Sequence, residues 1–136
     1  MFDRYMLVEN SLRYAEDNGV VKGYLVDIHY PHHCGIWLSI IEAIHLSVDG
    51  NPVDPEKMSL ILHGKSYPVL SLTDETTDRW YFGQAGTLFV EDPDGLAQGT
   101  HVLTLEMALR VSFLNWFLTG EDTKTMNICI REEKEQ

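Results

Sequence analysis

The densest group of potential metal ligands in the sequence is a short stretch with three imidazoles and one thiol, His29-Tyr30-Pro31-His32-His33-Cys34. Imidazole nitrogen and thiolate sulfur are the ligands that zinc and related metals prefer. In an extended chain, however, His29 and His33 share one face and His32 points to the other, because side chains alternate along a strand. Pro31 and Gly35 mark the stretch as a strand end followed by a loop. The pattern favours a polar loop or an interface segment, and we predict no metal ligand in this chain.

The other histidines and the neighbouring carboxylates fit structural roles. His45 and His63 fall on the polar faces of predicted strands, and His101 begins a long strand, where we expect its side chain to bond back to the preceding turn. The carboxylate pairs lie in turns, where Asp bonds to local backbone. These pairs are Asp74 with Glu75 and Asp92 with Asp94. The sequence also lacks a Gly-x-Ser-x-Gly elbow, a phosphate-binding loop and a dinucleotide fingerprint, so we predict no catalytic residue and no cofactor here.

Aromatic side chains are concentrated in or beside the predicted loops, where they suit sugar stacking or a protein interface. They are Trp37, Trp80, Tyr81, Phe82, Trp116 and Phe117. We expect Trp80 and Phe82 to lie in the core. For Trp37 and Trp116, a position that caps the core and an exposed binding position fit equally well.

Between the loops, apolar and polar residues alternate with a period of two. The alternation covers residues 24–30, 44–48, 58–62 and 126–130. This period predicts half-buried strands, since successive side chains point to opposite faces. In the longest run, residues 103–113, the residue types also favour a helix. A helical register there meets Ser112 on its apolar face, so we predict a strand.

Turn signals separate these strands at regular intervals. Asn18-Gly19 and Asp49-Gly50 predict hairpins, because these residues tolerate the positive φ of primed turns. Further breaks are Asp54-Pro55, residues 92–95 and Thr119-Gly120. We predict an all-β fold, an antiparallel β-sandwich of jelly-roll or immunoglobulin-like type with roughly eight to nine strands. At most one short helical turn is expected, at residues 74–79.

Composition limits the function classes. A formal net charge of −11 excludes a nucleic-acid partner, because such binding requires Lys and Arg to neutralise phosphates. No apolar run approaches the roughly 20 residues that span a bilayer, and no secretory signal is expected. Cys34 and Cys129 show no zinc or disulfide-framework spacing. We expect a cytoplasmic protein with reduced thiols and a single domain, residues 1–136, whose acidic tail at 131–136 is frayed.

Several short stretches also follow one another in a distinctive order up to about Trp116. They are Met1-Phe2-Asp3-Arg4-Tyr5, Val8-Glu9-Asn10-Ser11-Leu12, residues 20–23, residues 35–41, Val48-Asp49-Gly50, Arg79-Trp80-Tyr81-Phe82-Gly83, Gly95-Leu96 and Gly99-Thr100-His101. The ordered set, rather than any single motif, resembles the small β subunit of bacterial C-glycoside deglycosidases.

The resemblance implies a β-sandwich subunit that assembles with a larger α subunit. The α subunit would be a TIM barrel that resembles sugar isomerases and epimerases and holds a divalent metal, typically manganese. The complex would be a lyase acting on the carbon–carbon bond between a 3-keto sugar and an aromatic, flavonoid-type aglycone. A base in the barrel would remove the proton made acidic by the neighbouring ketone, and the aglycone would leave with a proton delivered to its ring carbon. None of these roles maps onto a residue of this chain, so the resemblance implies a structural, non-catalytic subunit that is inactive alone.

The chain departs from the family pattern in two loops. His32-His33-Cys34-Gly35 stands where an aromatic-Arg-Gly loop is expected, and Phe113-Leu114-Asn115-Trp116 where an aromatic-Pro ending is usual. If these loops face the partner, partner choice or aglycone specificity differs. We predict the partner interface in residues 31–39 and 113–117. The candidate interface residues are His32, His33, Trp37, Trp116 and Phe117.

Two other functions are compatible with the residues. A stand-alone sandwich module would bind carbohydrate or protein with the loop aromatics as a stacking platform, and would be a stable monomer. A metal-dependent enzyme would be centred on His29, His32 and His33.

Overall fold

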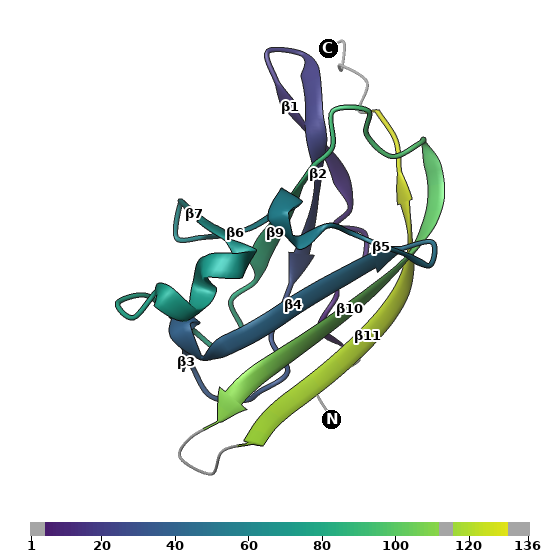
Figure 1. Cartoon of the computed structure of the whole chain (residues 1–136). Coiled ribbons are helices and arrows are strands. Elements are labelled where there is room, and N and C mark those ends of the chain that lie inside the picture. Colours follow the sequence, from purple (N-terminus) through teal and green to yellow (C-terminus); the bar gives the residue numbers. More distant parts are fainter. Residues whose placement is uncertain (1–4, 112–115, 131–136) are drawn as a thin grey trace.

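The computed structural model describes residues 5–111 and 116–130 as an antiparallel β fold (Figure 1). The strands are β1 (Arg13–Asp17), β2 (Val20–Ile28), β3 (Ile36–Trp37), β4 (Ile41–Val48), β5 (Asn51–Pro52), β6 (Met58–Leu62), β7 (Lys65–Pro68), β8 (Arg79–Trp80), β9 (Gly86–Glu91), β10 (Gly99–Val111) and β11 (Trp116–Ile128). The described residues also form the 3₁₀ segments η2 (Leu38–Ile40), η3 (Pro55–Lys57) and η4 (Val69–Asp74). No helix in this part of the chain is long and apolar enough to cross a bilayer.

The strands form two larger sheets and one short ribbon. Their orders are β1-β2-β9-β6-β7, β11-β10-β4-β5 and β3-β8, and every strand pairing is antiparallel. In Figure 1, β4, β10 and β11 run side by side in front of the first sheet. Apolar side chains from both larger sheets belong to one buried cluster. The predicted all-β antiparallel sandwich is therefore confirmed.

The two-residue alternation determines which side chains form the core. In β10 the buried residues are Leu103, Leu105, Met107 and Leu109. This segment pairs with β4 on one side and β11 on the other, so the predicted strand, and not the helix, is confirmed up to Val111. Residues 112 and 113 of the predicted strand lie outside the described residues. The alternations at residues 24–30, 44–48 and 58–62 are buried on the expected face as well. The last one ends early, because β11 stops at Ile128 and Ile130 is 53% exposed.

The predicted hairpin turns are present, together with one that the sequence did not reveal. Asn18-Gly19 and Asp49-Gly50 both have positive φ, as primed turns require. His63-Gly64 joins β6 to β7 with φ values of 55° and 77°, although His is not a typical residue for this conformation. The helical turn expected at residues 74–79 lies earlier in the chain, in η4, where Pro68 precedes the first 3₁₀ residue.

The N-terminal segment joins the two larger sheets. Leu7 forms a bridge with Ile28 at the end of β2, and its N–H donates to the Asp122 carboxylate of β11 at 2.8 Å. Asp122 is buried and lies 2.7 Å from the ammonium of Lys124. Inward-pointing charged side chains of this kind also discourage unwanted pairing along an edge strand such as β11. The segment brings Tyr5 close to the loop that follows β2, since Tyr5 and His29 line the same hollow.

Gly23 supplies a first test of this architecture. A Cβ on Gly23 would lie 1.8 Å from the carbonyl oxygen of Val90 in the neighbouring strand, and Gly23 has a φ of +159°. Gly23→Ala should lower the free energy of unfolding by about 3 kcal/mol or more, through overpacking and backbone strain. Gly64→Ala is the matched control, because a Cβ there meets nothing within 4 Å and only the positive φ opposes it. We expect Gly64→Ala to lower the free energy of unfolding by only about 1–2 kcal/mol. Equal losses in urea unfolding of the two variants would contradict the described register of β2 and β9.

Candidate functional site

The ribbon β3–β8 creates an exposed aromatic face at one end of the sandwich. Ile36 pairs with Trp80, and Trp37 pairs with Arg79. Because side chains alternate along a strand, Ile36 and Trp80 are buried, whereas Trp37 is 44% exposed and Arg79 is partly exposed. Exposed aromatic residues continue beyond the ribbon. We name this surface the aromatic end, and it consists of Tyr5, Trp37, Arg79, Tyr81 and Phe82.

The prediction that Trp80 lies in the core is confirmed, but the same prediction for Phe82 is wrong. Phe82 is 57% exposed. The reason is the turn that follows β8, in which the Gln84 N–H donates to the Tyr81 carbonyl at 3.0 Å and Gly83 has positive φ. This turn directs the chain away from the core space that the Trp80 indole already fills.

The buried Trp80 indole contacts both the loop after β2 and the loop after β8. Its Nε1–H donates to the Gln84 carbonyl at 2.7 Å, and its ring meets the Tyr30 ring edge-on with centroids 4.9 Å apart. The Tyr30 hydroxyl donates to the Trp80 carbonyl at 3.2 Å, and burial raises the pKa of Tyr30 to about 12. Gly86 is required beneath the indole, because a Cβ there would lie 2.9 Å from a Trp80 ring carbon.

The Asp78 carboxylate organises the chain just before the aromatic end. It accepts hydrogen bonds from the Tyr67 hydroxyl, from His63 Nδ1 at 3.0 Å and from the Arg79 N–H at 2.9 Å. The bond with Asp78 raises the pKa of Tyr67 to about 12, and it lowers the pKa of Asp78. His63 Nε2 lies 3.2 Å from the side-chain oxygen of Gln84, so the network spans the β6–β7 turn and the loop after β8.

The Arg79 guanidinium lies between two exposed rings. Its central carbon is 4.8 Å from the Trp37 ring centroid and 5.6 Å from that of Tyr81. Cation–π contacts of this kind contribute about 0.5–1 kcal/mol at exposed sites. The Nε atom of Arg79 is buried and has no hydrogen-bond partner. A buried hydrogen-bond donor without a partner lowers the stability of the folded state by about 1–3 kcal/mol, so such groups are rare in folded proteins.

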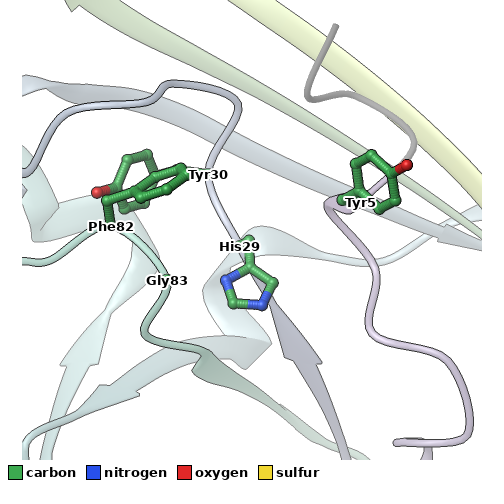
Figure 2. A pocket seen from close by; sticks show the side chains of 5 residues that line it. All are labelled: Tyr5, His29, Tyr30, Phe82 and Gly83. Atoms are coloured by element: carbon green, nitrogen blue, oxygen red, sulfur yellow. The ribbon is translucent and has the colours of Figure 1, made fainter.

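A hollow of about 330 Å³ adjoins these residues. Figure 2 shows Tyr5 and Phe82 on opposite sides of it, with the His29 ring between them. Tyr30 and Gly83 complete the lining. The hollow is walled mainly by aromatic rings, which suits an apolar or ring-bearing group.

The loops that build the aromatic end contain no carboxylates. There is no Asp or Glu between Asp27 and Glu42, and none between Asp78 and Glu91. The sequence has two other acid-free stretches that are at least as long, 57–73 and 107–120, so the two at the aromatic end matter for their position and not for their length. A protein that approaches the aromatic end therefore meets no carboxylate from these two stretches.

Phe117, from the second predicted interface segment, lies on β11 close to the point where the first segment leads into β4. Ile41, which follows the first segment, pairs with Leu109 near the end of β10, and Phe117 pairs with Arg110. Phe117 is 51% exposed. Residues 113–115 and the side chain of Trp116 lie outside the part that the structure describes.

The histidine loop adopts a bent arrangement after β2. His33 is exposed and His32 is half-buried, with their rings edge-on and centroids 4.9 Å apart. Burial, and secondarily His33, lowers the pKa of His32. Among the described residues, no group of three or more His, Cys, Asp or Glu side chains is placed to hold a metal ion. Cys34 and Cys129 are exposed, unbridged thiols.

His101 makes the turn contact expected from the sequence. Its Nε2 lies 2.7 Å from the Ala97 carbonyl oxygen, and its Nδ1 lies 2.6 Å from the Asp49 carboxylate. Because both ring nitrogens face an acceptor, both can donate a hydrogen bond only when the His101 ring is doubly protonated. The bond to Ala97, followed by that to Asp49, raises the pKa of His101 above its usual value of 6.5. This contact stabilises the fold and lies outside the aromatic end.

Sequence reasoning identified Trp37 but did not bring Tyr5 or Arg79 to the same surface. Both fell within stretches that carried the family resemblance, and nothing in their immediate sequence marks them as neighbours. Arg79 meets Trp37 through a two-residue strand pairing, and Tyr5 reaches the hollow beside Phe82 through the path of the N-terminal segment.

Two comparisons with known proteins bear on the chain. A family model described as C-glycoside deglycosidase beta subunit matches residues 2–113, a range that includes the whole aromatic end. A protein of Eubacterium cellulosolvens named C-glycoside deglycosidase beta subunit is 27% identical over 97 residues. The aligned region covers 71% of this chain and 66% of that protein, so the chain spans slightly less than two thirds of the relative's length.

The His101 contact gives a pH-dependent prediction. Because the folded-state pKa is raised, its stabilising effect is fully present below about pH 6.5 and is lost as pH rises through the folded-state value. The difference in unfolding free energy between the wild type and His101→Gln should therefore be largest near pH 6 and shrink at alkaline pH. Urea unfolding over a pH series, with an NMR titration of the imidazole, measures this. A difference that grows with pH would contradict the assigned contact.

Proposed function

This chain belongs to the family of C-glycoside deglycosidase beta subunits, and from that membership we propose that it is the structural, non-catalytic subunit of a heteromeric C-glycoside deglycosidase. In this role it binds an α subunit through the aromatic end and is inactive alone. Its own residues position and stabilise the partner, and the chemistry takes place on the α subunit.

The composition and position of the aromatic end carry this proposal. Protein interfaces are enriched in Tyr, Trp, Phe and Arg, and their centres are depleted of charged residues. Side chains whose removal most weakens binding are most often Trp, Tyr and Arg. The aromatic end combines these residue types with acid-free flanking loops on a chain of net charge −11. An exposed group of rings of this kind is typical of a surface that a partner covers.

The proposed reaction follows from the family assignment. The complex cleaves the carbon–carbon bond between a 3-keto sugar and an aromatic aglycone. A base on the α subunit removes the proton from the sugar carbon next to the ketone, and the electrons of that C–H bond form a carbon–carbon double bond in the sugar. The electrons of the broken sugar–aglycone bond pass to the aglycone ring carbon, which takes up a proton. We propose that the α subunit is a TIM barrel and that it holds a divalent metal, expected to be manganese, to stabilise the negative charge that develops on the sugar.

The histidine loop is proposed to tune this assembly. His32 and His33 lie in the segment that leads to Trp37, so they are adjacent to the aromatic end in the chain. Since the family pattern has an aromatic-Arg-Gly sequence at this point, we propose that the substituted loop changes the choice of α subunit or of aglycone.

The exposed rings also fit a stand-alone module that binds carbohydrate by stacking. That function predicts a monomer with sugar affinity in the absence of any α subunit, and the experiment below distinguishes the two.

Co-expression with the α subunit of the same organism tests the proposed function. We expect the two chains to co-elute as a stable heteromer in size-exclusion chromatography with light scattering. Only the mixture should cleave a 3-keto C-glucoside, because neither subunit alone provides the complete assembly. A monomer that does not bind the α subunit but does bind sugars would instead support the stand-alone module.

Truncation of the aromatic end tests the surface itself. Trp37→Ala and Phe82→Ala should each raise the Kd for the α subunit about 10- to 30-fold, as expected for side chains at the centre of an interface. Val20→Ala is the control, since Val20 is also exposed but lies on the β1–β2 hairpin at the other end of the sandwich (Figure 1). Titration calorimetry measures the three values. Equal weakening by Val20→Ala, or none by the other two, would place the interface elsewhere.

A further inference from the structure

Arg79 differs from the other arginines whose side chains the structure describes. Arg13 lies 3.2 Å from Asp27, and Arg110 lies 3.3 Å from Glu42. Among the described residues, no carboxylate lies within ion-pair distance of the Arg79 guanidinium, although the chain holds 21 acidic residues. The unpaired arginine is thus the one at the centre of the aromatic end.

The carboxylate nearest to Arg79 in sequence is already committed elsewhere. Asp78 accepts bonds from the Tyr67 hydroxyl, His63 and the backbone N–H of Arg79 itself. Both carboxylate oxygens of Asp78 are therefore already engaged. The fold therefore does not use its closest anion to neutralise this cation.

Two rings flank the Arg79 guanidinium, and one of its nitrogens is covered. Trp37 and Tyr81 flank it at 4.8 and 5.6 Å, and Nε is buried without a partner. A planar guanidinium that is already ordered loses little freedom when it binds a carboxylate through two parallel bonds. Because Nε is covered, an incoming carboxylate would meet the two terminal nitrogens end-on.

We propose that the Trp37–Arg79–Tyr81 stack is a receptor for an Asp or Glu side chain of the α subunit, an inference that rests on the proposed function. The bound carboxylate neutralises Arg79 at the centre of the interface, where the aromatic rings exclude water and strengthen the ion pair. A charge pair of this kind adds selectivity to an otherwise apolar contact, since a partner without the carboxylate leaves the cation buried and unpaired.

A protein carboxylate fits this site better than a polyphosphate. The net charge of −11 repels a multiply charged anion, whereas a single carboxylate is balanced by the one guanidinium. The acid-free loops 28–41 and 79–90 remove local repulsion from the approach to Arg79. Continuity with the exposed rings on either side places this contact within the proposed α-subunit interface.

The first arm of the test uses separately purified subunits. Arg79→Gln should raise the Kd for the α subunit at least about 10-fold, and Arg79→Lys, which keeps the charge but not the fork, should have a smaller effect. Arg13→Gln is the matched control, because this arginine is already paired with Asp27. The Kd of this variant should stay within about twofold of wild type.

Salt dependence separates an ion pair from ring packing. The wild-type Kd should rise with NaCl concentration more steeply than that of Arg79→Gln, because only the wild type loses a screened charge pair. Loss of ring packing alone would weaken binding by the same factor at every salt concentration. Equal salt slopes, or a weakening no greater than that of Arg13→Gln, would overturn the proposal while the heteromer itself stands.

The second arm uses the chain alone with acetate as the carboxylate probe. Sodium acetate, compared with sodium chloride at equal ionic strength, should shift the Arg79 side-chain NMR signal more than that of the already paired Arg13. No larger shift at Arg79 would overturn the carboxylate site. If acetate binds at Arg79 but no heteromer forms, the proposed function fails and the α subunit is excluded as the occupant.

Discussion

The aromatic end depends on the burial of the Trp80 indole. This side chain is fully buried, bonds to Gln84 and packs against Tyr30, so the two loops on either side of it are fastened to the core. Removing a buried Trp costs about 3–5 kcal/mol, several times the contribution of an exposed cation–π contact. The exposed rings are therefore held in place by the core beneath them, and their mutual contacts are too weak to impose the arrangement. Trp37 and Arg79 pair with each other and face solvent, because the residues next to them in their strands, Ile36 and Trp80, pair with each other and face inward.

Charge is distributed so that one end of an acidic molecule is accessible to another protein. The net charge of −11 makes the molecule as a whole repel acidic partners and copies of the same chain. The loops around the aromatic end lack carboxylates, and the cation at its centre is flanked by rings. This combination suits the proposed role as a subunit, since repulsion by the net charge disfavours unspecific approaches and the apolar rings supply the contact area.

Much of the fold follows from local patterns, and the exceptions have identifiable causes. The run at residues 103–113 was predicted as a strand because its apolar residues repeat every second position, and β10 confirms this up to Val111 through pairing on both sides. Phe82 was placed in the core by residue type, yet the turn at Gly83 carries it outward. The His63-Gly64 turn was not predicted, because tertiary bonds from Asp78 and Gln84 hold the histidine there.

The sequence by itself determined the fold class, the inward faces of the long strands, the hairpins at Asn18-Gly19 and Asp49-Gly50, and the turn contact of His101. These features are local, since side-chain alternation and turn conformation depend on residues close together in the chain. Only the tertiary structure decided the composition of the aromatic end. Trp37 and Arg79 are more than forty residues apart in sequence and meet through a pairing of two residues, too short to leave a periodic pattern. Tyr5 reaches the same surface because Leu7 is anchored to both sheets, a long-range constraint that no local preference encodes.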